Sequence, residues 1–205
     1  MIALDKDAGL WTVTLQRADK ANALTGQMLA DLDAIMAQAA QEQPRALILT
    51  GDGKVFSAGA DLDEARLGLA TDPVWDRLSN RIAALPCLTI AALNGTLAGG
   101  AMGMALACDL RIAVASAKFF YPVMRLAYAP QPADPARLVA LIGAARTKMI
   151  LLAGTRIDAV RAYEWGLIDE VVEPLDLISR ARILTADALH AVPGHGARLK
   201  SMIQS

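Results

Sequence analysis

The chain has 205 residues, of which 55% are apolar and 20% charged, and its formal net charge is −1. A chain of this length fits one domain with a sizeable core, and the absence of any basic block argues against a nucleic-acid partner. No apolar run reaches the roughly 18 residues of a membrane span, and the first residues lack the apolar core of a signal peptide. We therefore expect a cytoplasmic protein with no nucleic-acid or membrane partner.

In the first half of the chain, short apolar runs alternate with helical patterns. Thr25 is placed to cap a helix, Pro44 ends it, and Asp61 is placed to cap the next one. In chain order, the expected elements are strands at 2–4 and 10–15, a helix at 25–40, a strand at 46–49, helices at 61–66 and 73–85, a strand at 88–93, a helix at 100–107, a strand at 110–114 and an edge segment at 119–121.

The second half is mainly helical. Pro135 is placed at the first position of a helix that Asp134 would cap, and Asp158 is placed to cap another. The expected elements here are helices at 135–142, 147–152 and 158–165, a strand at 168–172 and a helix at 174–191. Repeated alternation of strands and helices predicts an α/β fold with a mainly parallel sheet.

The cysteines and histidines give no sign of metal or nucleophilic chemistry. Cys87 and Cys108 lie far apart in apolar stretches, without the spacing of a metal-binding pair. We interpret them as reduced core residues. The only histidines, His190 and His195, lie near the C-terminus, so no metal site is predicted.

Two segments share one local pattern, in which a buried strand leads into a glycine-containing turn and a helix start. They are VFSAGADL at 55–62 and NGTLAGGA at 94–101. A helix N-terminus offers unpaired N–H groups and the positive end of a dipole. If the two turns lie side by side, the N–H groups of Ala60 and Gly100 could converge on one oxygen and form an oxyanion hole without side chains. The alternative is that small residues only permit tight turns and close packing.

Four segments, in order, resemble the crotonase (enoyl-CoA hydratase/isomerase) superfamily over nearly the whole chain. They are RADKANAL at 17–24, ALILTGDGKVFSAGADL at 46–62, NGTLAGGAMGMALACD at 94–109 and DAVRAYEWGLIDEVV at 158–172. The resemblance implies the ClpP/crotonase spiral of ββα units. It implies a core domain over 1–173 and C-terminal helices over 174–205 that are shorter than the family's. It also implies a homo-oligomer, a trimer or a hexamer.

The resemblance further implies an acyl-CoA thioester as substrate. Its developing enolate would be held by the N–H groups of Ala60 and Gly100. No separate cofactor is implied, since coenzyme A is part of the substrate. The residues implied to line the coenzyme A path are Lys20, Ala21, Ala58, Asp61 and Leu62.

The chain departs from the family at both positions where its hydratases carry a catalytic glutamate, which here are Gly103 and Val123. Neither residue can move a proton, and hydration needs a proton carrier within about 3 Å of the substrate, directly or through one water. Ordinary enoyl-CoA hydration is therefore not expected. Decarboxylation, thioester hydrolysis or an atypical isomerisation fits better, and the alternative is a catalytically silent acyl-CoA-binding or subunit-interaction module.

Four nearby side chains could replace the missing glutamates. Asp134 could carry a proton, or could act only as a helix cap. Tyr121 and Tyr128 flank the second glutamate position and could donate a hydrogen bond to an enolate, or could pack with their hydroxyls at the surface. Arg125 could bind a substrate carboxylate, or be solvated. Asp61, beside the first oxyanion donor, is interpreted as a helix cap.

Overall fold

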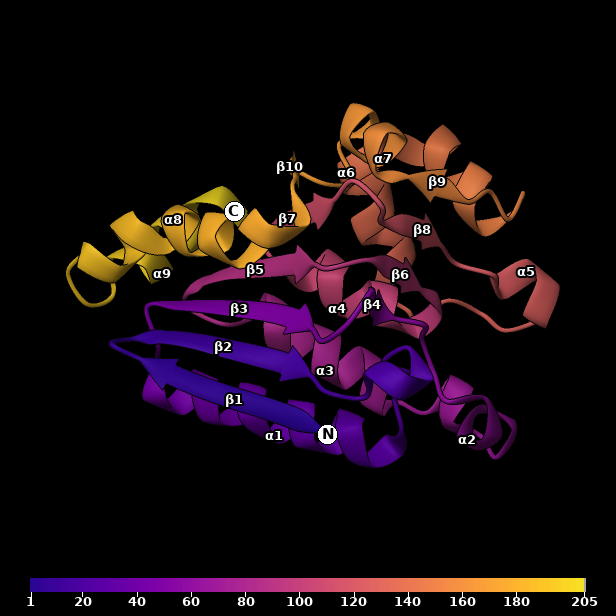
Figure 1. Cartoon of the computed structure of the whole chain (residues 1–205), viewed down its shortest axis with the longest axis horizontal. Helices are drawn as coiled ribbons and strands as arrows, with labels where there is room; N and C mark the ends of the chain where they lie inside the picture. The colour runs from indigo at the N-terminus through magenta and orange to yellow at the C-terminus, as the bar shows by residue number, and fades with distance from the viewer. Residues whose placement is uncertain (205) are drawn as a thin grey trace.

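The computed structural model describes residues 1–204 (Figure 1). Ser205, the last residue of the predicted C-terminal range, lies outside them. The strands are β1 (Ile2–Asp7), β2 (Leu10–Leu15), β3 (Ala46–Gly51), β4 (Val55–Ser57), β5 (Leu88–Leu93), β6 (Thr96–Ala98), β7 (Leu110–Val114), β8 (Lys118–Phe120), β9 (Ile157–Asp158) and β10 (Glu170–Val172). The α-helices are α1 (Gly26–Glu42), α2 (Leu62–Arg66), α3 (Val74–Ala83), α4 (Met102–Ala107), α5 (Val123–Leu126), α6 (Asp134–Leu151), α7 (Ala159–Trp165), α8 (Leu177–His190) and α9 (His195–Gln204). Short 3₁₀ helices are η1 (Ala18–Lys20), η2 (Leu69–Thr71), η3 (Gly99–Ala101) and η4 (Pro174–Asp176).

The strands form two sheets. The larger has the order β1-β2-β3-β5-β7-β10 and the smaller the order β4-β6-β8-β9. All pairs are parallel except the β1–β2 hairpin and the β8–β9 pair. Three times in succession the chain adds one strand to the larger sheet, one to the smaller sheet and then a helix: β3–β4, β5–β6 and β7–β8 each begin such a unit. This repetition confirms the expected α/β spiral of ββα units.

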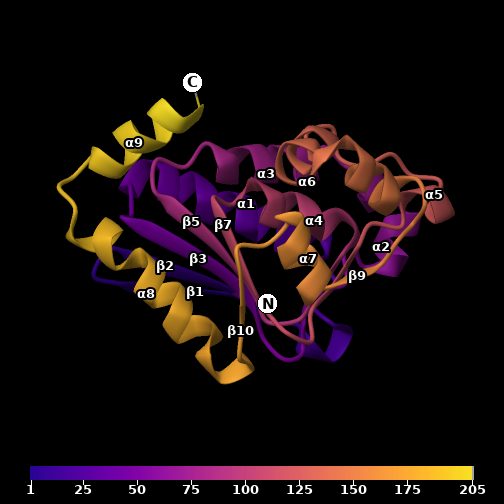
Figure 2. The same ribbon diagram turned by 90° about the horizontal axis from the view of Figure 1, so that it is seen from above.

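Helices cover both faces of the larger sheet. On one face α1 contacts α3 and α3 contacts α4, while α8 packs across β3, β5 and β7 on the other face (Figure 2). The central strands are therefore enclosed on both sides, and Leu47, Ile48 and Leu49 of β3 have no exposed surface. A parallel sheet buried on both faces requires such continuous apolar strands. No helix within residues 1–204 is long and apolar enough to cross a membrane.

The predicted helix ends are largely confirmed. The Thr25 hydroxyl accepts a hydrogen bond from the Met28 N–H at 3.2 Å and so begins α1. The Asp158 carboxylate accepts one from the Arg161 N–H at 2.9 Å and begins α7, which ends at Gly166 in the left-handed conformation. Local side-chain chemistry therefore sets these boundaries.

Two predictions about elements are wrong. The segment at 119–121 was expected at an edge, but β8 lies between β6 and β9. Asp134 does not cap α6, because Ala133 occupies the cap position and Asp134 is the first helical residue. The expected separation of the helices at 135–142 and 147–152 is confirmed, because α6 is interrupted at Gly143, whose φ of 77° and ψ of 162° are non-helical.

The two cysteines are free and buried, as predicted. Burial raises the pKa of the Cys87 thiol to about 11 and that of the Cys108 thiol to about 12. Both are therefore protonated at neutral pH and poor nucleophiles.

Candidate active site

The two glycine turns singled out in the sequence touch each other. Gly59 has a φ of +96°, and a Cβ at this position would lie 3.0 Å from the Ala98 carbonyl oxygen and 3.3 Å from the Gly99 Cα. A side chain at residue 59 would therefore push the turns apart. Glycine supplies both the left-handed conformation and the close approach. The condition on which an oxyanion hole depends, that the turns lie side by side, is met.

Within the described part of the chain, no backbone acceptor is found for the N–H groups of Ala60 and Gly100. Leu24 donates to Gly59 and accepts from Asp61, each at 2.8 Å, which leaves the Ala60 N–H without a hydrogen-bond acceptor among the described residues. Gly100 lies in the first turn of η3, where N–H groups have no partner within the helix. Ala60 and Gly100 line one cavity of about 270 Å³.

The residues implied to bind coenzyme A cluster at this cavity or beside it. Ala58 and Leu62 line it. The Ala58 N–H donates to the Ala21 carbonyl at 3.0 Å, so Ala21 and the preceding Lys20 lie beside this turn; Lys20 is exposed. Asp61 does not line the cavity among the described residues, because its carboxylate faces its own helix.

Asp61 has the structural role that the sequence predicted. Its carboxylate accepts from the backbone N–H groups of Asp63 and Glu64 at 3.1 and 3.4 Å and thereby caps α2. The Arg17 guanidinium donates to the same carboxylate at 2.8 Å. The hydrogen bond from Arg17, followed by that from Glu64, lowers the pKa of Asp61. This carboxylate is fully engaged and is a poor proton acceptor.

Asp134 is buried within hydrogen-bonding distance of the cavity lining. Its side chain has no exposed surface, and its Oδ2 accepts from the Tyr121 hydroxyl at 3.0 Å. The same hydroxyl accepts from the Gln131 N–H at 3.2 Å. Both Tyr121 and Gln131 line the cavity, so the hydroxyl connects it to the carboxyl group.

The other carboxyl oxygen of Asp134 has no hydrogen-bond partner among residues 1–204. It faces α4, since a Cβ on Gly103 would lie 2.9 Å from Oδ1. The Arg137 guanidinium lies 4.0 Å from Oδ1, but it donates its hydrogen bonds to Ser79 and Asn80. The carboxyl group of Asp134 thus fills space that only a glycine at position 103 leaves open.

Burial shifts the pKa values of both Asp134 and Tyr121. Desolvation raises the pKa of Asp134 to about 6, although the Tyr121 hydrogen bond and the charge of Arg137 oppose the shift. Desolvation, reinforced by the charge of Asp134, also raises the pKa of Tyr121. Tyr121 therefore keeps its proton, while Asp134 can gain or lose one near neutral pH, as a general acid or base requires.

The remaining candidate positions are Tyr128, Val123 and Arg125, and they differ in whether they line the cavity. Tyr128 lines the cavity and is 37% exposed, and Val123, at the second glutamate position, contributes an apolar wall. Arg125 is exposed and is not part of the cavity lining among the described residues. It is therefore poorly placed to bind a substrate carboxylate there.

Trp75 is a cavity residue that the sequence analysis missed. A Cβ on Gly100 would lie 3.2 Å from the indole ring, so the ring lies directly against the proposed oxyanion turn. The side chain is 2% exposed, and its Nε1 donates to the Leu69 carbonyl at 2.7 Å. Nothing local indicates this contact, because residues 75 and 100 come from different units of the spiral.

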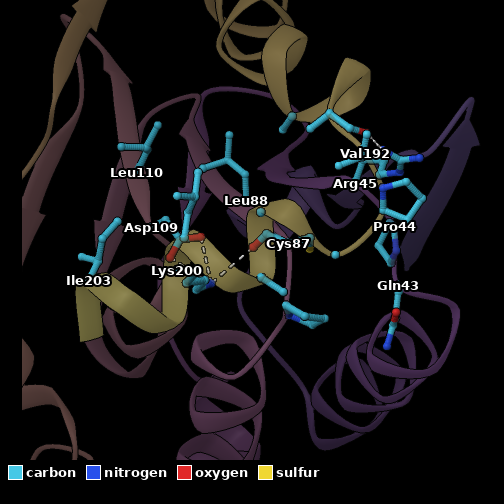
Figure 3. A pocket seen from close by; sticks show the side chains of 18 residues that line it. Gln43, Pro44, Arg45, Cys87, Leu88, Asp109, Leu110, Val192, Lys200 and Ile203 are labelled. Atoms are coloured by element: carbon cyan, nitrogen blue, oxygen red, sulfur yellow. Dashed lines mark hydrogen bonds and ion pairs between the residues drawn. The ribbon is translucent and has the colours of Figure 1, made fainter. Parts of the chain in front are cut away.

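A larger cavity of about 490 Å³ lies between the α8–α9 hairpin and the beginnings of β3, β5 and β7 (Figure 3). Lys200 of α9 donates to Asp109 at 2.9 Å and to the Cys87 carbonyl at 3.3 Å, as the dashed lines show. Asp109 also accepts from Thr89. The charged groups of Lys200 and Asp109 therefore satisfy each other and attach α9 to the sheet.

Comparison with known proteins points to one family. The profile of the enoyl-CoA hydratase/isomerase family matches residues 5–205. YngF of Bacillus subtilis (strain 168), which bears the name of that family, is 41% identical over 88% of this chain and 72% of its own. The 4-chlorobenzoyl coenzyme A dehalogenase-1 of an Arthrobacter species is 32% identical over 95% of this chain and 74% of its own.

A solved structure agrees with the sequence matches. The enoyl-CoA hydratase of Bacillus anthracis superimposes with a TM-score of 0.91 at 33% identity, covering 100% of this chain and 82% of its own. The fold is therefore shared over the whole chain. The names of these relatives cover hydration and dehalogenation of coenzyme A thioesters, so one scaffold hosts several reactions.

Proposed function

The chain belongs to the enoyl-CoA hydratase/isomerase family, and on that premise we propose that it binds an acyl-CoA thioester and stabilises the enolate formed from it. The observation that carries this proposal is the contact between the two glycine turns, with Ala60 and Gly100 lining one cavity. Two N–H groups without other acceptors would donate to the thioester oxygen as it gains negative charge. Such a preorganised hole is typically the largest single contribution to a reaction of this kind.

We further propose that Asp134 is the proton carrier and that it acts through Tyr121. The Tyr121 oxygen would accept a proton from the carbon next to the thioester carbonyl, while its own hydroxyl proton passes to Oδ2 of Asp134. No tyrosinate forms in this concerted step, which suits the raised pKa of Tyr121. The reverse step returns a proton to the enolate. Tyr128, a lining residue of the cavity that is partly exposed, is proposed to donate a hydrogen bond to the substrate.

Among the reactions considered from the sequence, this arrangement favours an atypical isomerisation. A proton removed from one carbon and returned to another moves a double bond without any added group. Decarboxylation has less support, because Arg125 lies outside the cavity lining and Arg66, which lines it, donates to Asp63 at 3.1 Å. Thioester hydrolysis has no additional observation in its favour. The silent binding module is the alternative in which the hole binds a thioester and no proton moves.

The first test is a calorimetric titration with acetoacetyl-CoA, whose enolate form mimics the proposed intermediate, against free coenzyme A. The proposal expects a clear preference for acetoacetyl-CoA, because only the thioester can occupy the hole. Equal binding of the two ligands, or binding of neither, would contradict it.

A second test separates an enzyme from a silent binder. Exchange of the α-protons of a saturated acyl-CoA in heavy water is followed by proton NMR. The proposed proton transfer predicts exchange well above the rate without protein. Binding of acetoacetyl-CoA with no exchange above that background would instead support the silent module.

A further inference from the structure

The walls of the 270 Å³ cavity carry an unusual share of the chain's aromatic side chains. The whole sequence contains only three Trp, three Tyr and three Phe residues. An even spread would put about one of them among the sixteen lining residues, yet Trp75, Tyr121 and Tyr128 are all there. The buried core cluster is filled mainly by aliphatic side chains, and Trp75 and Tyr121 belong both to it and to the cavity wall. Aromatic surface is thus concentrated where a ligand would bind.

Two of these rings are held in place by hydrogen bonds. The Trp75 indole donates to the Leu69 carbonyl at 2.7 Å, and the Tyr121 hydroxyl donates to Asp134 at 3.0 Å. Both side chains are almost completely buried. Walls that are fixed before binding favour a ligand of matching rigid shape, because neither partner loses much conformational freedom.

Trp75 also lies where the acyl group must begin. Its ring would touch a Cβ on Gly100 at 3.2 Å. A carbonyl oxygen held by the Gly100 N–H therefore brings the attached acyl carbons within reach of the indole. The cavity is small, below the roughly 300–1,000 Å³ of typical ligand pockets, which disfavours a long fatty chain.

We propose that the acyl group of the substrate is a short aromatic one, with its ring one carbon away from the thioester carbonyl, so that the carbon between them keeps a proton to lose. This inference rests on the proposed function, since the thioester oxygen in the Ala60/Gly100 hole sets where the ring lies. Ring-on-ring contacts with Trp75 and Tyr121 would then select a planar aromatic group over a flexible chain of equal size.

Three coenzyme A thioesters with the same number of acyl carbons test this on the whole chain: phenylacetyl-, cyclohexylacetyl- and octanoyl-CoA. Calorimetry measures the dissociation constant of each. We expect phenylacetyl-CoA to bind about tenfold more tightly than octanoyl-CoA, with cyclohexylacetyl-CoA between them. Octanoyl-CoA binding as tightly as phenylacetyl-CoA would overturn the inference. Equal binding of the two ring compounds would also overturn it, because compactness and not aromaticity would then be selected.

Substitutions of the aromatic residues in the cavity wall test which side chains cause the preference for an aromatic acyl group. Trp75→Leu and Tyr128→Leu each remove one aromatic wall, and each should reduce the phenylacetyl-to-octanoyl ratio severalfold. Trp165→Leu is the matched control, since Trp165 lies on α7 and packs near Arg146 and Arg161. It should leave the ratio unchanged. Tyr128 is 37% exposed, so its variant should fold even if Trp75→Leu does not. A ratio that Tyr128→Leu leaves unchanged, or that Trp165→Leu lowers equally, would count against the inference.

The acetoacetyl-CoA titration separates a failure of the aromatic preference from a failure of the proposed function. If acetoacetyl-CoA binds more tightly than free coenzyme A but phenylacetyl-CoA gains nothing over octanoyl-CoA, the aromatic preference is wrong and the proposed function stands. If no thioester binds more tightly than coenzyme A, both are wrong.

Discussion

The two cavities compared above differ in whether the polar groups at their walls are paired. The larger, about 490 Å³ beneath α9, contains the ion pair of Lys200 and Asp109, whose groups satisfy each other. The smaller, about 270 Å³, is bordered by the N–H of Ala60 and lies next to Oδ1 of Asp134, two groups that have no hydrogen-bond partner among the described residues. Buried polar groups are usually paired, so those left unpaired need a reason. A substrate that approaches them supplies one, which is why the smaller cavity is the better candidate site.

The strongest test of this comparison exchanges a carboxyl group for an amide at each cavity: Asp134 behind the lining of the smaller one, and Asp109 in the lining of the larger one. Asp134→Asn should lower the rate of α-proton exchange by about 100- to 10,000-fold, the usual contribution of a general acid–base group. Asp109→Asn should leave the rate almost unchanged. Proton NMR in heavy water measures both, with circular dichroism to confirm folding. An Asp134→Asn variant that exchanges at the wild-type rate would exclude Asp134 as the proton carrier.

Removing one donor of the proposed hole should have the next largest effect. Gly100→Pro has no N–H at residue 100, and the exchange rate should fall by about 100- to 1,000-fold. Gly100→Ala is the control, because it keeps the N–H and adds only a methyl group against Trp75. If both variants lose the same activity, crowding and not the missing donor is responsible. Thermal melting shows whether either variant is unfolded.

The raised pKa of Asp134 predicts a pH dependence of stability. Its folded-state value of about 6 lies above the ordinary value of 3.8, so the folded state binds the proton more tightly. This contribution is complete below about pH 4 and is lost as the pH rises through 6. It is on the order of 3 kcal/mol. Urea unfolding at pH 4 and pH 7 measures it, as the difference between wild type and Asp134→Asn. A difference that is constant with pH would contradict the shift.

The smallest expected effect concerns the larger cavity. Lys200→Met leaves Asp109 without its cation and should lower the free energy of unfolding by about 1–2 kcal/mol, since the pair is only partly buried. The exchange rate of the folded protein should not change. A large loss of exchange in Lys200→Met, with normal folding, would mean that the larger cavity takes part in the reaction after all.

Much of the fold was predictable because its signals are local. Thr25 and Asp158 cap helices through contacts three residues away, and a glycine-containing turn follows a buried strand in each of the segments 55–62 and 94–101. The adjacency of the turns at Gly59 and Gly99 came from the family resemblance rather than from any local rule. The position of β8 inside its sheet was missed, because an apolar segment of three residues reads the same at an edge and in the middle.

Like the fold, the candidate site has some features that the local sequence predicts and others that depend on tertiary contacts. The sequence by itself determined the two turns, since small residues and helix starts are local properties, together with the absence of a glutamate at Gly103 and Val123. Only the tertiary structure decided what replaces the missing groups. As a polar residue before a proline, Asp134 has the local pattern of a helix cap. It becomes a buried carboxyl group with a raised pKa only because α6 brings it against Gly103 and Tyr121. Desolvation depends on every element packed around a group, and no stretch of sequence near Asp134 contains that information.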